Sequence, residues 1–136
     1  MPAVPAPMPA KPTVLFIDDD ATTRKVYTAG LAMAGIPMHM AASAEEAGKI
    51  LETHKIDVIV TDLMMPNYSG VDLIQAVRAA DYTKHIPIIV FTSGGNLDLI
   101  AEANRSGANE VLQKHSTPPA KLIALILKLD EDAWKK

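Results

Sequence analysis

The chain has 136 residues, about half of them hydrophobic (49%), with no cysteine and a formal net charge of −3. This length and composition predict one domain with a packed core, exclude disulfides and thiolate metal sites, and argue against nucleic acid or an anionic membrane surface as the main partner. Because no apolar run reaches the length of a membrane span and the N-terminus lacks the pattern of a secretory signal, the sequence predicts a cytoplasmic protein.

The N-terminal stretch 1–12, MPAVPAPMPAKP, holds half of the ten prolines in the chain. Proline lacks the backbone N–H that helices and central strands use, so this stretch predicts an extended, disordered tail. The folded domain is therefore expected over residues 13–136.

The first predicted strand covers residues 13–17, TVLFI, an apolar run typical of a strand buried on both faces. The acidic run 18–20, DDD, follows it directly. Residues 22–34 then predict a helix, which Gly35 ends. The expected inward face of this helix consists of Val26, Tyr27, Leu31 and Ala34.

A weaker strand is expected over residues 36–42. Pro37 cannot donate to a neighbouring strand, which indicates the edge of a sheet. Ser43 and Glu46 have the spacing of a capping box, so we expect a second helix to begin here and to run to about His54.

The next strand, over residues 57–61, ends in an acid, Asp62, and is followed by a loop that contains Pro66 and Gly70. A carboxylate at the carboxyl end of a buried parallel strand lies where open α/β sheets place their chemistry. An aspartate in such a position also caps helices and forms turns. Taken alone, Asp62 fits both interpretations.

The remaining elements continue to alternate. They are a helix at 70–80 that buries Val71, Ile74 and Val77, a strand at 86–91, a helix at 97–105, a strand at 109–113, and a helix that starts at Pro118 or Pro119 and runs to about Trp134. Five strands alternating with five helices predict an α/β fold with a parallel sheet covered on both faces.

The last helix has more apolar residues than one face can hold. If the core takes Leu122, Leu125, Ile126 and Leu129, then Ile123 and Leu127 remain. These two residues are expected to mark a dimer or partner surface, unless the core face is broad enough to include them.

Polar side chains follow four of the five predicted strands at the point where each strand ends: the acids 18–20, Asp62, Thr92 and Lys114. The carboxyl ends of parallel strands share one edge of a sheet. Clustered carboxylates repel one another unless a cation joins them, and an oxygen-rich pocket suits Mg²⁺. With Lys114 as a second positive charge and Thr92 as a donor, Asp62 is a candidate nucleophile that forms an aspartyl phosphate.

Four motifs, in this order and at this spacing, resemble the receiver domain of two-component response regulators over residues 13–134. The motifs are FIDDD (16–20), TDLMMPNYSG (61–70), IIVFTS (88–93) and GANEVLQK (107–114). The resemblance is to the stand-alone, chemotaxis-regulator-like type. It implies a doubly wound (βα)₅ flavodoxin-like fold, a three-layer sandwich whose five-stranded parallel sheet has the order 2-1-3-4-5.

Carried over position by position, the resemblance implies a Mg²⁺ site made by Asp18, Asp19, Asp62 and the backbone carbonyl of Met64. Asp19 would be the direct ligand of the acid pair, and Asp18 would act mostly through water. Asp20 is expected to serve the helix that follows it.

The resemblance also implies that Asp62 is the phosphoacceptor, Thr92 the switch hydroxyl and Lys114 the counter-charge of the phosphoryl group. A sensor histidine kinase, a histidine phosphotransfer protein or a small phosphodonor would supply that group. The protein would catalyse its own phosphorylation and dephosphorylation, but its role would be signalling and not that of an enzyme. Its face formed by the fourth helix, fifth strand and fifth helix would then contact a downstream protein or continue a phosphorelay.

No contact with nucleic acid or membrane is expected, and the chain is predicted to be a monomer or a weak, phosphorylation-dependent dimer. Because the chain ends soon after the last predicted helix, output is expected to come from protein contacts or phosphoryl relay.

The sequence departs from the family pattern at several positions. His115 follows Lys114 where most members have proline, and Val111 stands where many have an aromatic residue, which excludes a switch based on rotation of that aromatic ring. Met64 and Ser93 occupy positions at which the family tunes hydrolysis. Since a methionine side chain cannot orient an attacking water by hydrogen bonding, we expect a long-lived phosphoryl state.

Two other functions are compatible with parts of the sequence. A pseudo-receiver would bind partners without phosphorylation. A haloacid-dehalogenase-type phosphatase would use Asp18 as its nucleophile, within the pattern Asp18-x-Asp20-x-Thr22, but Asp62 then lies out of order. The four histidines fall on different elements without metal-ligand spacing, and each is expected to act as an individual surface or packed residue.

Overall fold

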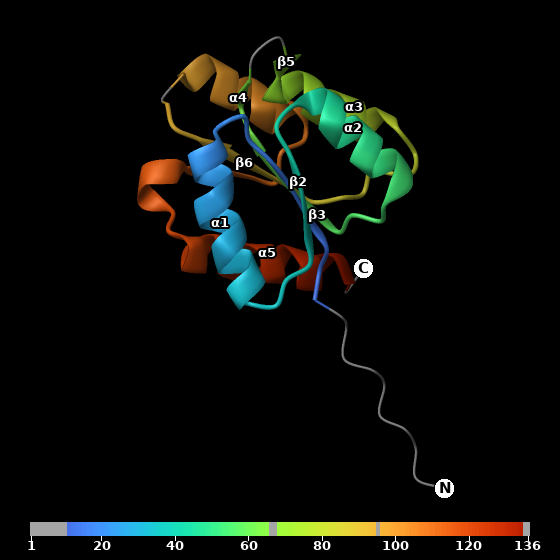
Figure 1. The fold of residues 1–136 in the computed structure, drawn as a ribbon. Coiled ribbons are helices and arrows are strands. Elements are labelled where there is room, and N and C mark those ends of the chain that lie inside the picture. The colour runs from blue at the N-terminus through green and yellow to red at the C-terminus, as the bar shows by residue number, and fades with distance from the viewer. Residues whose placement is uncertain (1–10, 66–67, 95, 135–136) are drawn as a thin grey trace, which may run out of the picture.

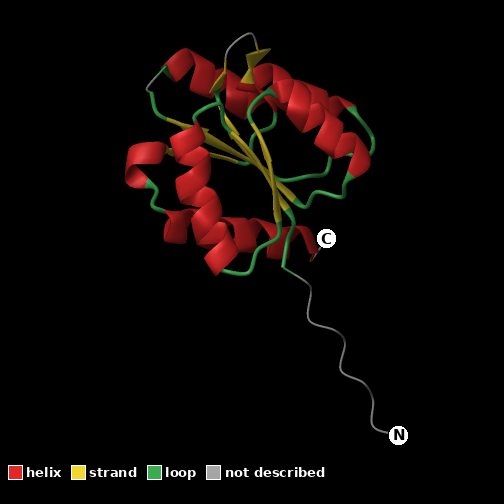
Figure 2. Cartoon of the chain, viewed as in Figure 1, coloured by secondary structure: helices red, strands yellow, loops and turns green. Residues whose placement is uncertain are grey.

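The computed structural model describes residues 11–65, 68–94 and 96–134. Its centre is a five-stranded sheet in the order β2-β1-β3-β6-β7, in which all neighbouring strands are parallel (Figure 2). The strands are β1 Val14–Ile17, β2 Met38–Ala41, β3 Val58–Asp62, β6 Ile88–Thr92 and β7 Glu110–Gln113. The predicted fold class and strand order are therefore confirmed.

Five helices cover the two faces of the sheet (Figure 1). They are α1 Ala21–Met33, α2 Ala44–Thr53, α3 Gly70–Ala79, α4 Leu97–Ser106 and α5 Pro119–Trp134. Helices α1 and α5 pack on one face through Leu31, Leu122 and Ile126. Helices α2, α3 and α4 pack on the other through residues such as Ala47, Ile74 and Ala103. The result is the expected three-layer sandwich.

Alternate residues of each central strand enter opposite layers of the core. Phe16 and Val60 face α1 and α5, whereas Leu15 and Ile59 face α2, α3 and α4. Strands β1, β3 and β6 are buried along their full length. Burial on both faces explains why these strands read as unbroken apolar runs.

Local signals in the sequence set the helix ends. Asp20 caps α1, and Ser43 caps α2 by accepting a hydrogen bond from the Glu46 N–H. The Glu46 carboxylate accepts from the N–H of Ala42, so the reciprocal half of the predicted capping box is displaced by one residue. Gly35, just after α1, has a φ of +73°, a conformation that favours glycine.

Three details differ from the predictions. A short hairpin, β4 Met64–Met65 and β5 Tyr68–Ser69, interrupts the loop after β3. Val26 is 50% exposed, so its predicted inward orientation is wrong; the buried residues of α1 are Thr28 and Leu31. Ile123 packs against the core, which leaves Leu127 as the exposed apolar residue of the predicted pair.

A short 3₁₀ turn, Lys114–Ser116, joins β7 to α5, and the peptide bonds of the described residues are all trans. Within the described ranges, no helix combines the length and apolar character that a membrane crossing requires. Residues 1–10 of the predicted tail and Pro66 of the predicted loop lie outside the described residues.

Candidate functional site

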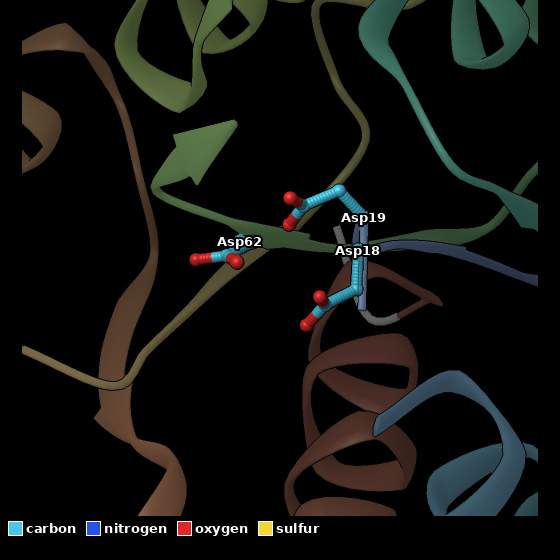
Figure 3. A group of neighbouring side chains, drawn as sticks. All are labelled: Asp18, Asp19 and Asp62. Atoms are coloured by element: carbon cyan, nitrogen blue, oxygen red, sulfur yellow. The ribbon is translucent and has the colours of Figure 1, made fainter. Parts of the chain in front are cut away.

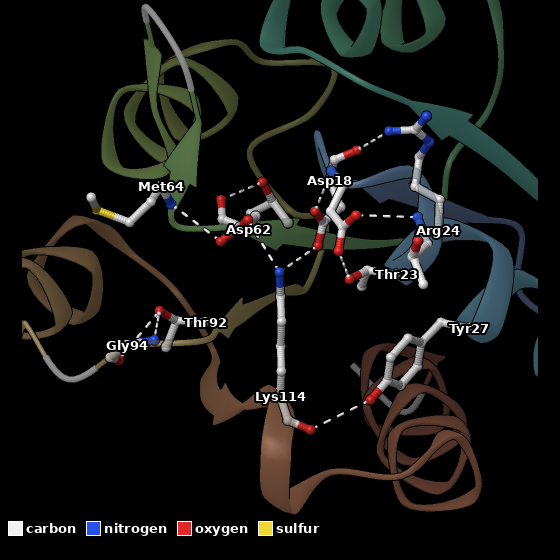
Figure 4. A network of polar contacts seen from close by, with 12 residues as sticks. Asp18, Thr23, Arg24, Tyr27, Asp62, Met64, Thr92, Gly94 and Lys114 are labelled. Atoms are coloured by element: carbon white, nitrogen blue, oxygen red, sulfur yellow. Dashed lines mark hydrogen bonds and ion pairs between the residues drawn. The ribbon is translucent and has the colours of Figure 1, made fainter.

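The carboxyl ends of the strands bring the predicted site residues to one edge of the sheet. Asp18 follows β1 directly, Asp62 ends β3, Thr92 ends β6 and Lys114 follows β7. The parallel register pairs Asp62 with Phe91 and Thr92 with Gln113, so these strand ends lie level with one another. Residues separated by almost a hundred positions in the chain therefore share one site (Figure 4).

Three carboxylates form the centre of the site. Asp18, Asp19 and Asp62 each place one carboxylate oxygen within 4.8 Å of the other two (Figure 3). Asp18 and Asp62 are only 1% and 6% exposed, whereas Asp19 is exposed. Burying two like charges side by side is unfavourable unless a cation lies between them.

Lys114 provides that positive charge. Its ammonium lies 2.7 Å from Oδ2 of Asp18 and donates a hydrogen bond of 3.2 Å to Oδ2 of Asp62. Burial opposes the charge on Lys114, but the close contact with Asp18 and the negative charge of Asp62 outweigh it and raise the pKa of the ammonium. Burial raises the pKa of Asp62, and the neighbouring charge of Lys114 offsets part of that rise.

Backbone groups orient the two buried carboxylates. Oδ1 of Asp18 accepts from the N–H of Asp20 at 2.9 Å, and Oδ1 of Asp62 accepts from the N–H of Met64 at 3.2 Å. These bonds turn the Oδ2 atoms of both residues toward Lys114. The contact with Met64 places that backbone next to Asp62, and the role of its carbonyl as a metal ligand stays a prediction.

The donor set fits a hard divalent cation. Oδ2 of Asp18 is buried and, within the described part of the chain, accepts no well-aligned hydrogen bond, although Lys114 lies close to it. Three convergent carboxylates, one of them with a buried oxygen that lacks a well-aligned donor, match the ligands that Mg²⁺ prefers. Asp18, Asp19 and Asp62 would hold the ion.

Thr92 reaches the same edge, but its hydroxyl is turned away from the acids. Oγ1 accepts from the N–H of Gly94 at 3.3 Å and lies 3.4 Å from the Gly94 carbonyl oxygen. In Figure 4, Thr92 stands apart from the network that joins Asp18, Asp62 and Lys114. The structure thus brings three predicted residues into direct contact and holds the fourth nearby with a local partner.

Asp20 serves helix α1, as expected. Its carboxylate accepts from the N–H of Thr22 at 3.2 Å and from the hydroxyl of Thr23 at 2.7 Å. The hydrogen bond from Thr23, followed by that from the Thr22 N–H, lowers the pKa of Asp20. This carboxylate therefore completes the helix cap and is not part of the acid cluster.

Two residues of α1 contact the site without any signal in the sequence. Arg24 donates a hydrogen bond of 2.6 Å to the backbone carbonyl of Asp18. Tyr27 donates to the backbone carbonyl of Thr117 at 2.7 Å and lies 3.5 Å from that of Lys114. Both contacts depend on how α1 docks against the sheet, which a helical pattern alone does not define.

The expectation that all four histidines act individually is wrong for one pair. His39 on β2 and His54 at the end of α2 have ring centroids 4.3 Å apart. Helix α2 packs back against the edge strand β2, so its end lies near the start of that strand and the two imidazoles meet despite their separation in sequence.

Comparison with known proteins agrees with this fold. The family profile described as the response regulator receiver domain matches residues 14–127. The chemotaxis protein CheY of Pseudomonas aeruginosa is 33% identical over 105 residues, which cover 76% of this chain and 85% of that protein. The phosphate regulon transcriptional regulatory protein PhoB of the same organism is 31% identical over 106 residues, or 78% of this chain. This chain spans 46% of the length of PhoB.

Solved structures lead to the same family. A response regulator receiver protein from Pseudomonas putida has a TM-score of 0.81 and 33% identity, with coverage of 89% of this chain and 99% of that one. A CheY-like receiver domain protein from Methanospirillum hungatei has a TM-score of 0.85 at 20% identity, with coverage of 93% and 98%, and supports the fold alone.

The fold and site define a doubly wound α/β domain with an acidic site at the carboxyl ends of its strands. The chain belongs to the receiver domain family of two-component response regulators.

Proposed function

We propose that the protein is a signalling receiver that accepts a phosphoryl group on Asp62 in a Mg²⁺-dependent reaction. The observation that carries this proposal is the setting of the Asp62 carboxylate. It is buried, belongs to a group of three acids and is 3.2 Å from the ammonium of Lys114. The phosphodonor would be a sensor histidine kinase, a histidine phosphotransfer protein or a small acyl phosphate.

The chemistry follows from the charges around Asp62. A carboxylate oxygen of Asp62 attacks phosphorus, the bond from phosphorus to the donor nitrogen or oxygen breaks, and the donor leaves with that electron pair. Lys114 stabilises negative charge on the transferred group, because its ammonium already lies beside Asp62. Asp18 and Asp19 would hold Mg²⁺, which supplies further positive charge to the phosphoryl oxygens.

The response to phosphorylation would involve Thr92. Among the described residues, its hydroxyl has only a local partner, Gly94, in the present arrangement. A phosphoryl group on Asp62 offers stronger, charged acceptors, so the hydroxyl would turn toward it. The loop before α4 would follow, which would change the face made by α4, β7 and α5. Val111 is half-buried on that face and, unlike an aromatic residue, adds no ring rotation.

The output would be binding of a downstream protein or transfer of the phosphoryl group to another carrier. Both would take place in the cytoplasm, where ATP-dependent kinases supply phosphoryl groups.

Self-association would be weak. With Ile123 packed on the core, Leu127 on α5 is a small apolar contact compared with the area of a stable dimer. Sedimentation with and without beryllofluoride tests this point, and a tight dimer in both states would exclude it.

Phosphorylation itself is tested by intact mass after incubation with acetyl phosphate and Mg²⁺. We expect the wild-type protein to gain one acid-stable, base-labile phosphoryl group, which Asp62→Asn abolishes. Labelling that requires Asp18 but survives Asp62→Asn would instead indicate a phosphatase that uses Asp18. Absence of any labelling would indicate a pseudo-receiver.

A further inference from the structure

The loop that carries Lys114 has His115 where most relatives are expected to have proline, so other contacts must fix its shape. Lys114–Ser116 form a single 3₁₀ turn, and His115 and Ser116 are exposed. Lys114 is half-buried and must hold its ammonium within reach of two carboxylates. Exposed neighbours give this turn little packing, so the contacts at its buried end decide its position.

Thr117 is that buried end. It is 1% exposed, and its hydroxyl donates to the carbonyl of Gln113 at 2.8 Å, which closes the turn on itself. The carbonyl of Thr117 accepts the 2.7 Å hydrogen bond from the Tyr27 hydroxyl, and the carbonyl of Lys114 lies 3.5 Å from the same hydroxyl. One side chain on α1 thus contacts both sides of the turn. Figure 4 shows its contact with the Lys114 carbonyl.

The ring of Tyr27 is fixed by aromatic neighbours. It stacks on Phe16 of β1 with centroids 6.0 Å apart and meets Phe91 of β6 edge-on at 4.8 Å. Phe91 in turn lies beneath the Lys114 ammonium, 5.9 Å from ring centroid to Nζ. Tyr27 therefore packs against β1 and β6 and also contacts the backbone of the Lys114 turn. Through Phe91 it is linked to the Lys114 ammonium.

Helix α1 is itself a firm support for this contact. Gly30, one turn after Tyr27, faces the start of α5 so closely that a methyl group there would be 2.9 Å from Cβ of Pro119. A tyrosine hydroxyl is already protonated at neutral pH and can donate, and burial raises the pKa of Tyr27 further. A rigid helix with a persistent donor can hold the turn in one position.

We propose that Tyr27 is a positioning residue that sets the place of Lys114 by binding the turn between β7 and α5. The inference rests on the proposed function, since the position of Lys114 affects phosphorylation only if Asp62 receives a phosphoryl group. The hydrogen bond from Tyr27 thus supplies part of the restraint on the turn that a proline after the lysine would supply.

The test is Tyr27→Phe, which keeps the ring and removes the hydroxyl. We expect the maximal rate of phosphorylation by acetyl phosphate to fall about fivefold, the equivalent of one ordinary hydrogen bond. The Mg²⁺ concentration that gives half of the maximal rate should not change, because Tyr27 does not touch the acids. Amide NMR resonances of residues 114–117, and the side-chain Nζ resonance of Lys114, should shift or broaden even without phosphodonor.

Two controls separate positioning from stability. Thr28→Val removes an α1 hydroxyl that donates to the Arg24 carbonyl within the same helix, and Tyr82→Phe removes a hydroxyl from an exposed tyrosine. Both should be phosphorylated at the wild-type rate. Equal losses in Tyr27→Phe and Thr28→Val would overturn the inference, as would a wild-type rate with unchanged Lys114 resonances in Tyr27→Phe.

The two proposals fail in different ways. A wild-type protein that takes no label contradicts the proposed function, and the NMR comparison of wild-type protein with Tyr27→Phe still decides whether the tyrosine positions Lys114. A labelled wild type with an equally active, spectroscopically unchanged Tyr27→Phe variant contradicts the inference alone.

Discussion

The ammonium of Lys114 lies 2.7 Å from Oδ2 of Asp18, closer than the 3.2 Å that separates it from Oδ2 of Asp62, and Asp18 is almost completely buried. The lysine balances a negative charge that water cannot reach. In the absence of a metal ion, this pairing must contribute to the stability of the fold as well as to the chemistry of Asp62.

Replacement of Lys114 by methionine should therefore destabilise the metal-free protein. It leaves the buried carboxylates without a neighbouring positive charge, which costs about 3 kcal/mol of unfolding free energy. Urea denaturation would measure the loss, and saturating Mg²⁺ should reduce it because the ion restores positive charge. Lys84→Met is the control: that lysine lies 3.2 Å from exposed Asp81, and its loss should cost at most about 0.5 kcal/mol. Equal losses in the two variants would contradict this prediction.

Gly70 should tolerate no side chain, because α3 begins directly against the strand that carries Asp62. A methyl group at Gly70 would be 2.6 Å from the backbone oxygen of Asp62 and 2.8 Å from Cα of Leu63. Since both neighbours are backbone, Gly70→Ala should cost about 1–3 kcal/mol and slow phosphorylation of Asp62.

Gly48 provides the matched comparison for Gly70. It lies within α2 with nothing near its Cβ position, so Gly48→Ala should stabilise the protein by up to about 1 kcal/mol. Thermal unfolding would measure the stability of both variants, and acetyl phosphate labelling would measure their phosphorylation. A harmless Gly70→Ala would show that the start of α3 can move away from Asp62.

The strand ends could be predicted from sequence because each central strand is buried on both faces and so appears as an unbroken apolar run with an abrupt polar end. The parallel connections then dictate that Asp18, Asp62 and Lys114 meet. The hairpin β4–β5 gave no such signal, since two residues per strand are too few to show a period. The exposed Val26 and packed Ile123 reflect the rotation of each helix about its axis, which tertiary packing sets.

Asp130 on α5 should oppose stability at neutral pH. Burial, then the charge of Asp57, raises the pKa of this carboxyl, while Lys55 partly lowers it. A raised pKa in the folded state means that the folded protein binds the proton more tightly than the unfolded chain. Protonated Asp130 therefore contributes stability that is fully present below the unfolded-state pKa. That stability is lost as the pH rises through the folded-state pKa.

Asp130→Asn should consequently raise the free energy of unfolding at pH 7, by less than about 1 kcal/mol, and should flatten its dependence on pH in the acidic range. Urea denaturation from pH 4 to 7 would show both effects. Asp132→Asn, at an exposed position on the same helix, controls for the change in net charge. A loss of stability at pH 7 in Asp130→Asn alone would count against the prediction.

The phosphoryl group on Asp62 should be long-lived. The Met64 side chain, two residues beyond Asp62, is 60% exposed and cannot hold a water by hydrogen bonding. Met64→Asn supplies a donor and an acceptor at that place and should speed dephosphorylation roughly tenfold. Met33→Asn, at an exposed methionine at the end of α1, should leave the rate unchanged. Decay of the wild-type label within a few seconds in Mg²⁺ buffer would refute the idea.

The described part of the chain begins and ends at the edge of the sheet opposite Asp62. Strand β1 begins at Val14, shortly after Lys11, and runs toward the acids, and α5 runs back from the Lys114 turn, so Lys11 and Ala133 line a common cleft at the opposite end of the sheet. A fluorescent label attached at Lys11 or Ala133 is thus separated from Asp62 by the full length of the strands. Protein immobilised through either of these residues should therefore present its acidic face outward, open to a phosphodonor in solution.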